Sequence, residues 1–162
     1  MATYEGRIRW GLQLPPYFDQ SQLVSVADLL NQYIDQGLRY VSCIDNIPNA
    51  LIIDSETEKS VIESNQDIGT MGEKLVKSIG LSNVHRFRKL LDERISIIGC
   101  GGISSGQDVF EYILAGADAV EIASQLLVET PLCFDRIKQE LKSLLHHKNY
   151  TCIKQFKNKL DT

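Results

Sequence analysis

The chain has 162 residues, of which 43% are hydrophobic and 23% are charged, so residues 1–162 hold enough apolar material for a single domain with its own core. Its formal net charge of −4 provides no basic surface for nucleic acid or anionic lipid. No apolar run approaches the ~20 residues of a membrane span, and the N-terminus shows no signal-peptide pattern, so we expect a cytoplasmic protein without nucleic-acid or membrane partners.

The first part of the chain alternates strand and helix. Residues 7–14 predict a strand, which the Pro-Pro pair at 15–16 stops. Residues 20–37 place apolar side chains at helical spacing and end at Gly37. Residues 38–45 predict a second strand.

Residues 46–79 interrupt this alternation. Within them, residues 50–64 predict two short strands joined by a polar turn, which is a hairpin pattern. Residues 65–74 predict a loop that contains glycines. An insertion of this length between a strand and a helix is typical of a segment that lies near a functional site.

Regular alternation resumes after the insertion. Residues 82–93 predict a helix, with Ser82 as its N-cap. Residues 95–101 predict a buried strand, and residues 105–116 predict a helix that ends in glycine.

The last part of the chain completes the pattern. Residues 117–124 predict a fourth strand. Residues 130–148 begin with Thr-Pro, a favourable start for a helix, and residues 151–160 predict a short closing helix.

Repeated strand–helix units indicate parallel strands joined by helical crossovers. Two architectures fit, an open doubly wound sheet and part of a (β/α)8 barrel, which needs about 250 residues in full. Four units in 162 residues are half of such a barrel. We therefore predict an α/β fold: half of a TIM-type barrel, with four parallel βα units and a hairpin insertion after the second strand.

The segment after the third strand, "GCGGISSG" (99–106), is the best candidate for a ligand site. Glycine lets a ligand approach the backbone closely because it has no Cβ. The N–H groups of Gly101, Gly102 and Ile103 are candidate donors to an anion, and the helix that begins near Ser105 adds the positive end of its dipole.

The fourth strand ends in Ala123 and Ser124, which are also small. In a βα barrel, phosphate groups often bind the loops after the last two strands, so the two strand ends together favour a phosphate site. The alternative is a tight strand-to-helix turn without a ligand. Asp45 and Asn46 end the second strand at the same edge and are candidate contacts to a ligand.

The four cysteines form no C-x-x-C pair, so we expect no metal site. Cys43 and Cys100 lie inside apolar strands, where a free thiol packs as a small core residue. A nucleophilic role for Cys100 is the alternative to packing. Unpaired cysteines fit a reducing, intracellular compartment.

Five stretches follow one another without large gaps: "GLQLPPYFD" (11–19), "YVSCIDNIPNALIID" (40–54), "LSNVHRF" (81–87), "IIGCGGISSGQDVFEYILAGADAVEIAS" (97–124) and "NYTCIKQFKNKL" (149–160). Together they resemble the C-terminal half of class 1A dihydroorotate dehydrogenase, the fumarate-using kind. The resemblance covers essentially the whole chain after its first few residues.

The resemblance implies an FMN-containing (β/α)8 barrel, usually a homodimer, that oxidises dihydroorotate to orotate in pyrimidine biosynthesis. The flavin takes a hydride, and fumarate reoxidises it. In that family paired glycines matching Gly101 and Gly102, and a Gly-Thr pair matching Ala123 and Ser124, bind the FMN phosphate. The cofactor-binding positions expected in this chain are Gly101, Gly102, Ile103, Ala123, Ser124, Gln13, Ile44 and Gly72.

The chain departs from the family at several of these places. A flavin-contacting Lys is Gln13 here, which supplies no charge to the reduced flavin. The Asn-Ser pair that holds orotate is matched by Asp45 and Asn46, and a carboxylate there repels the orotate carboxylate. The Gly-Gly-x-Gly-Gly loop becomes "GTMGE" (69–73), with Glu73 in place of a glycine.

The family's catalytic cysteine lies on a loop of the N-terminal half and has no counterpart in these residues. We therefore expect this chain alone to be inactive, and we assign it no catalytic residue. Two hypotheses follow. The chain is half of a dihydroorotate dehydrogenase that pairs with a complementary half-barrel chain or with itself, or it is a degenerate, non-catalytic half-barrel that serves as a structural or complex subunit.

Overall fold

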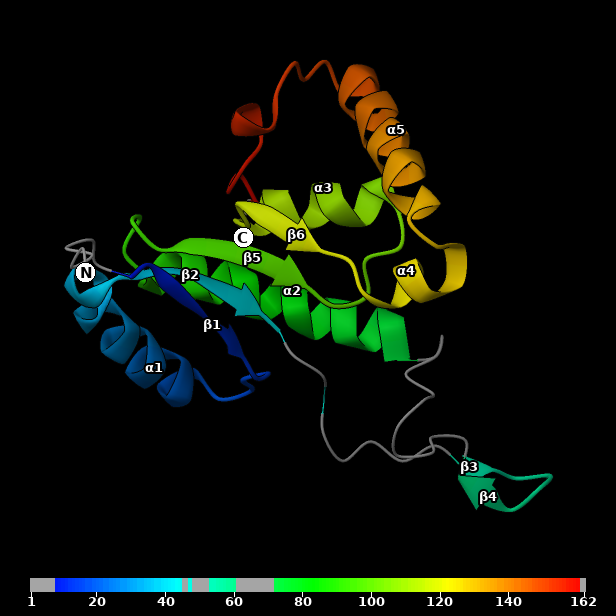
Figure 1. Cartoon of the computed structure of the whole chain (residues 1–162), viewed down its shortest axis with the longest axis horizontal. Coiled ribbons are helices and arrows are strands. Elements are labelled where there is room, and N and C mark those ends of the chain that lie inside the picture. The colour runs from blue at the N-terminus through cyan, green and yellow to red at the C-terminus, as the bar shows by residue number, and fades with distance from the viewer. Residues whose placement is uncertain (1–7, 45–46, 48–52, 61–71, 161–162) are drawn as a thin grey trace, which may run out of the picture.

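The computed structural model describes residues 8–44, 47, 53–60 and 72–160. Its main sheet has four parallel strands in the order β1 (Trp10–Leu14), β2 (Leu38–Cys43), β5 (Ser96–Cys100) and β6 (Ala119–Glu121) (Figure 1). The strand order follows the chain order without the reversal that defines a doubly wound sheet. The predicted half-barrel arrangement is therefore confirmed.

The helices of the repeating units pack beside one another. They are α1 (Gln20–Gln32), α2 (Gly72–Leu90) and α3 (Gly106–Ala115), and α2 contacts both of the others (Figure 1). After β6 come α4 (Ser124–Glu129) and α5 (Leu132–His147), and α5 packs on α3. Two 3-10 turns, η1 (Ile34–Gln36) and η2 (Ile153–Gln155), follow α1 and α5.

The core lies between the sheet and these helices. Alternate strand residues point to opposite faces of a sheet, and Val41, Cys43 and Ile97 bring one face of β2 and β5 into the core. Helix α2 covers that face with Val84 and Phe87, which are fully buried. Among the described residues, no helix is long and apolar enough to cross a membrane.

The predicted hairpin is present. Strands β3 (Ile53–Asp54) and β4 (Lys59–Ser60) pair antiparallel, with Ile53 opposite Ser60. Asp54 accepts hydrogen bonds from the backbone N–H groups of Glu56 and Thr57, so its side chain closes the turn.

The predicted boundaries of α2 were wrong. The helix begins at Gly72 instead of residue 82, so Ser82 lies inside it and is not an N-cap. Gly80 interrupts the apolar pattern, but its lack of a side chain has a tertiary reason: a Cβ there would lie 2.2 Å from the Tyr112 hydroxyl on α3. The glycine permits close packing of the two helices.

The end of the chain also differs from the prediction. The fourth strand, predicted over 117–124, covers only Ala119–Glu121, and Ser124 is already the first residue of α4. The closing helix predicted over 151–160 is only the 3-10 turn η2. Helix α5 does begin next to the Thr-Pro pair, and Pro131 is its N-cap residue.

Candidate functional site

The carboxyl ends of the four parallel strands meet along one edge of the sheet. Gln13 of β1 lies opposite Ser42 of β2. The N–H of Ile44, just after β2, donates a 3.0 Å hydrogen bond to the carbonyl of Cys100. Cys100 in turn lies opposite Glu121 of β6. This register brings Gln13, Ile44, the Gly101–Ile103 loop and the Ala123–Ser124 pair to the same edge.

The loop after β5 has a backbone that requires glycine. Gly101 and Gly102 have φ angles of 111° and 64°, which side-chain-bearing residues rarely adopt. A Cβ on Gly101 would also lie 2.7 Å from Cγ1 of Val76 on α2. Within the described part of the chain, the N–H groups of Gly102 and Ile103 have no acceptor. Two adjacent backbone donors are therefore available for an anion.

The Tyr112 side chain stabilises this loop through its hydroxyl. Its hydroxyl lies 3.1 Å from the carbonyl oxygen of Cys100 and 2.8 Å from that of Gly101, and its one proton is shared between these two acceptors. The ring is fully buried against Gly99, where a Cβ would lie 2.4 Å from it. Burial raises the pKa of the Tyr112 phenol, so the group stays a neutral donor.

The start of α3 is already occupied by the protein's own carboxylates. Asp108 accepts hydrogen bonds of 2.9 and 2.8 Å from the N–H groups of Ser104 and Ser105, and Glu140 accepts one of 2.8 Å from Gly106. The amides of Ser104, Ser105 and Gly106 are therefore already paired and not open to an anion. The N–H groups of Gly102 and Ile103, in the loop before this helix, make no such bond.

Asp108 is a capping residue held in its charged form. Burial acts to raise its pKa, but hydrogen bonds from Lys77, Ser104 and Ser105 outweigh that effect and lower it. Lys77 also pairs with Glu111, 2.6 Å away. The capping box Ser-x-x-Asp at 105–108 was readable in the sequence, although sequence analysis did not use it.

The end of β6 leads directly into α4. Ala123 is its exposed N-cap residue and Ser124 its first residue. Among the described residues, the Ser124 hydroxyl makes no hydrogen bond, so it is available to a ligand at the edge that also holds the Gly101–Ile103 loop.

The remaining predicted positions differ in what they offer. Gln13 is exposed at the end of β1. The Ile44 side chain is 1% exposed, so only its backbone is open to a ligand. Gly72 is the first residue of α2 instead of a loop residue. Asp45 and Asn46, the predicted substrate-binding pair, lie outside the described residues.

The two strand cysteines are not alike. Cys43 is buried, and burial, with a smaller contribution from Cys100, raises the pKa of its thiol to about 12. A thiol that keeps its proton is a poor nucleophile, so Cys43 is a packing residue, as predicted. Cys100 is only partly buried and faces the side of the sheet away from α2.

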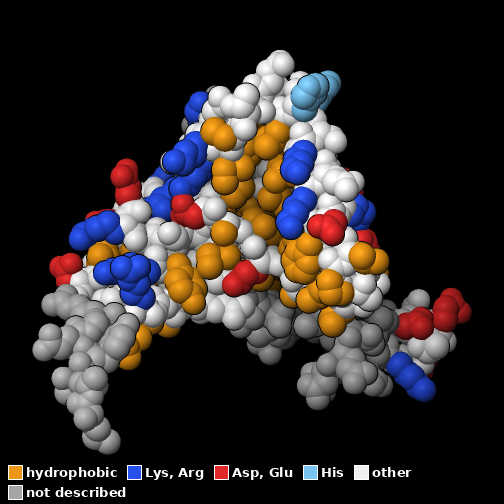
Figure 2. Space-filling view, turned by 45° about the horizontal axis from the view of Figure 1, so that its top comes forward, with side chains coloured by type: hydrophobic (Ala, Val, Ile, Leu, Met, Phe, Trp, Pro, Cys, Tyr) orange, Lys and Arg blue, Asp and Glu red, His pale blue; other side chains and the backbone are white. Residues whose placement is uncertain are grey.

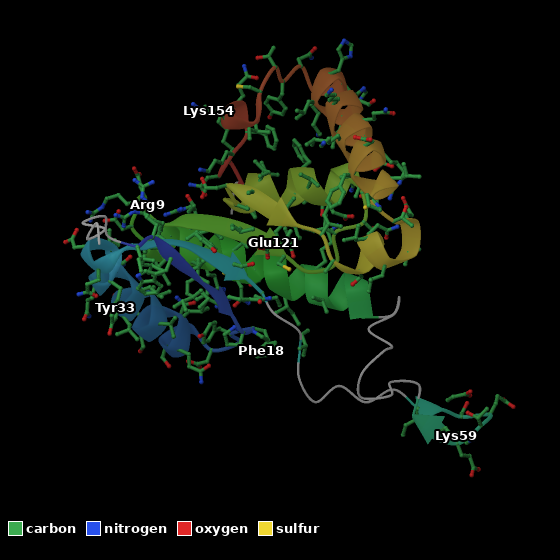
Figure 3. The ribbon with its side chains drawn as sticks, in the orientation of Figure 1. Arg9, Phe18, Tyr33, Lys59, Glu121 and Lys154 are labelled. Carbon is green, nitrogen blue, oxygen red and sulfur yellow. The ribbon has the colours of Figure 1, made fainter. Side chains whose placement is uncertain are left out.

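That side of the sheet carries polar residues which sequence analysis missed. The hydroxyl of Ser42 donates a 2.6 Å hydrogen bond to a carboxylate oxygen of Glu121 (labelled in Figure 3). Tyr40 stands on the same face, where its ring fills the space that a Cβ on Gly11 would occupy. Figure 2 shows hydrophobic side chains among charged ones at the molecular surface. In a closed barrel, the face of the sheet that bears Ser42, Tyr40 and Glu121 is the interior.

Comparison with known proteins supports a specific family. The family model for dihydroorotate dehydrogenase matches residues 8–145. The dihydroorotate dehydrogenase (fumarate) of Lachancea kluyveri is 43% identical over 152 residues, which are 94% of this chain and 48% of the relative. That of Saccharomyces cerevisiae is 41% identical with the same coverage. The chain spans about half the length of the curated relatives it matches.

Solved structures agree on the fold. A crystal structure of Eimeria tenella DHODH in complex with ferulenol superposes with a TM-score of 0.69 at 23% identity, covering 92% of this chain and 37% of that one. The ligand-free form from the same organism gives a TM-score of 0.71 at 21% identity and covers 39% of that chain. The partial coverage agrees with half of a barrel.

Proposed function

Because this chain belongs to the dihydroorotate dehydrogenase family, we propose that it forms the FMN-phosphate half of a flavoenzyme barrel that oxidises dihydroorotate to orotate and passes the electrons to fumarate. The observation that carries the proposal is the Gly101–Ile103 loop, with its two positive φ angles and the unpaired N–H groups of Gly102 and Ile103. When bound, FMN supplies the hydride-accepting group.

This chain's own residues fit the phosphate end of FMN. The amides of Gly102 and Ile103 donate to phosphate oxygens, and the Ser124 hydroxyl donates from the neighbouring strand end. Two side chains fix the loop on both sides. The Tyr112 hydroxyl donates to the carbonyls of residues 100 and 101, and the Asp108 carboxylate accepts from the N–H groups of residues 104 and 105. A rigid set of donors binds an anion without further ordering of the loop.

At the ring end the chain contributes less. Gln13 lies at the exposed end of β1, where the family has a Lys, and an amide donates hydrogen bonds but carries no charge. The reduced flavin is therefore less stabilised here than in relatives with a cation at this position. This observation favours the second candidate function, a half-barrel that retains FMN without turning over dihydroorotate.

The barrel interior has to be completed by further strands. Strands β1 and β6 have one paired neighbour each in the described sheet, so each leaves an open edge. Parallel sheets are normally covered on both faces, and the face that bears Tyr40 and Glu121 has no layer of described residues over it. We propose that a complementary half-barrel or a second copy of this chain covers it.

The test begins with the absorbance spectrum of the purified chain after incubation with FMN. Bound FMN that bleaches when dihydroorotate is added supports the enzyme. Bound FMN that does not bleach is what both candidate functions predict for this chain alone, because the family's catalytic cysteine lies outside these residues, so that outcome supports FMN retention without choosing between them. A chain that binds no flavin overturns the FMN proposal.

A pair of variants locates the binding site. Gly102→Ala adds a methyl group in the phosphate loop at a φ angle of 64°, and we expect it to weaken FMN binding tenfold or more. Asn158→Ala is the matched control, since Asn158 has a φ angle of 56° and bonds Ile113 near the opposite end of the sheet. Equal effects of the two substitutions would argue against the loop as the site.

A further inference from the structure

We propose that Arg136 is a positioning residue that ties the loop after β5 to the helix after β6 and so holds the two halves of the phosphate site in register. This inference rests on the proposed function, since the site it positions is the FMN-phosphate site. Arg136 lies on α5 and is not itself among the predicted contacts to phosphate.

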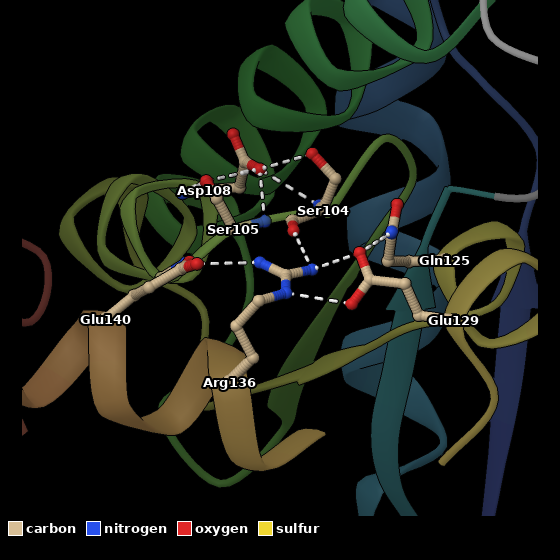
Figure 4. Close-up of polar contacts among 8 residues, drawn as sticks. Ser104, Ser105, Asp108, Gln125, Glu129, Arg136 and Glu140 are labelled. Atoms are coloured by element: carbon tan, nitrogen blue, oxygen red, sulfur yellow. Dashed lines mark hydrogen bonds and ion pairs between the residues drawn. The ribbon is translucent and has the colours of Figure 1, made fainter. Parts of the chain in front are cut away.

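The guanidinium binds three structural elements at once (Figure 4). Its Nη2 donates a 3.0 Å hydrogen bond to the carbonyl of Ser104, in the loop after β5. Its Nε and Nη2 form a bidentate pair with Glu129 at the end of α4, at 2.8 and 2.7 Å. Its Nη1 pairs with Glu140 on α5 itself at 2.7 Å. Loop, α4 and α5 are therefore joined through one cation.

Glu140 extends this connection to α3. One of its oxygens accepts from Arg136, and the other accepts from the N–H of Gly106 at 2.8 Å. Gly106 lies so close to α5 that a Cβ there would be 2.2 Å from the N atom of Leu141. The first turn of α3 is thereby fixed to α5 directly behind the Gly101–Ile103 loop.

On the α4 side, Glu129 is held in turn by Gln125, whose side-chain amide donates to the carboxylate oxygen that Nη2 of Arg136 also contacts. Gln125 directly follows Ser124, the predicted phosphate contact at the end of β6. The cluster Ser104–Gln125–Glu129–Arg136–Glu140 therefore begins one residue from each of the two phosphate-binding segments.

The chemistry of this cluster requires arginine. Four hydrogen bonds leave the guanidinium in three directions, and its planar fork matches the Glu129 carboxylate, whereas a Lys ammonium is a point charge that cannot span the same acceptors. Arg136 also neutralises two carboxylates beside the loop. Its loss leaves Glu129 and Glu140 as uncompensated negative charge close to the phosphate.

The cluster contributes more to position than to global stability. The Arg136 side chain is 37% exposed, and ion pairs at such sites stabilise a fold little. Loss of Arg136 is therefore expected to release residues 103–106 and α4 while the core between the sheet and α2 stays folded. The affinity for a ligand that carries a phosphate should fall when these segments are released, whereas the affinity for the same ligand without its phosphate should not.

The test compares FMN with riboflavin on the full chain. We expect Arg136→Gln to weaken FMN binding at least tenfold, to leave riboflavin binding within twofold, and to lower Tm by no more than a few degrees. Arg136→Lys keeps the charge without the fork and is expected to show most of the same loss. Arg94→Gln is the control, because Arg94 makes an exposed ion pair with Asp92 before β5, at the opposite end of the sheet. Equal losses for FMN and riboflavin, or no loss for either, would overturn the proposal.

A second readout separates this inference from the proposed function. Hydrogen exchange of the unliganded chain should show faster exchange in Arg136→Gln at residues 104–106 and 124–129, with α1 unchanged. If the parent chain binds neither flavin, the FMN proposal fails, and faster exchange at those segments still supports the positioning role. Unchanged exchange overturns the positioning role whatever the parent chain binds.

Discussion

Glu121 on β6 accepts a 2.6 Å hydrogen bond from the hydroxyl of Ser42 on β2, although β5 lies between these two strands. The long Glu121 side chain therefore reaches over β5 on the face that a closed barrel would enclose. Ser42 is buried beneath it. A carboxylate on this face has a hydrogen-bond donor within the half-barrel itself.

Removal of the Ser42 hydroxyl tests this relationship. Ser42→Ala leaves the Glu121 carboxylate without its donor, and we expect the free energy of unfolding to fall by about 1 kcal/mol. Glu121→Gln keeps an acceptor for the hydroxyl and should change stability by less than about 0.5 kcal/mol. Urea unfolding measures both. Ser96→Ala, at an exposed position on β5, is the control, and an equal loss there would contradict the assignment.

The Tyr112 hydroxyl provides a second test, because it is the support of the glycine loop. Tyr112→Phe removes the donor shared by the carbonyls of Cys100 and Gly101, which should lower the free energy of unfolding by about 1–2 kcal/mol. It should also weaken FMN binding. Tyr33→Phe, at a side chain that is 42% exposed, should change neither quantity. Unchanged FMN affinity in Tyr112→Phe would show that FMN binding does not depend on the hydrogen bonds of the Tyr112 hydroxyl to this loop.

Much of the architecture was predictable because it depends on local patterns. Alternating strand and helix signals identified four parallel strands in chain order, and Gly37 marked the end of the first helical segment with a φ angle of 110°. The glycine pair at 101–102 was found because a strand end with several glycines has few local explanations. These features need only neighbours in sequence.

The rest depended on contacts between distant residues. Gly80 and Ser82 resemble a helix boundary, but Gly80 is inside α2 because Tyr112, 32 positions away, occupies the space of its side chain. The Arg136 contact to Ser104 likewise joins residues 32 positions apart. No periodicity or spacing rule reports such pairs, so the residues that hold the Gly101–Ile103 loop were missed, while the loop itself was identified as a candidate site.

The raised pKa of the Cys43 thiol predicts how the free energy of unfolding changes at alkaline pH. Burial raises its pKa to about 12 from an ordinary value of 9.0, so the folded chain keeps a proton that the unfolded chain loses above pH 9. The free energy of unfolding is unaffected below about pH 9 and falls by about 1.4 kcal/mol per pH unit as pH rises toward 12. Tyr112, whose pKa is also raised, adds to the fall above its ordinary value of 10.0.

Urea unfolding between pH 7 and 11 measures this dependence. Cys43→Ala should lower stability at pH 7, because it opens space in the core, but flatten the profile above pH 9. Cys152→Ala is the control, since Cys152 is exposed and its removal should leave the profile unchanged. A Cys43→Ala profile as steep as that of the parent chain would show that another group carries the alkaline loss.

The open edge of the sheet predicts the association state of the 18.2 kDa chain. Among the described strands, β1 is paired only with β2, and Leu12 on it is 41% exposed, so a second strand can pair along its free edge. Light scattering should therefore give a mass above that of one chain. Leu12→Lys places a charge on that edge and should shift the population toward the monomer, whereas Leu29→Lys, at a similarly exposed leucine on α1, should not. A monomeric parent chain, or equal effects of the two lysines, would contradict pairing through β1.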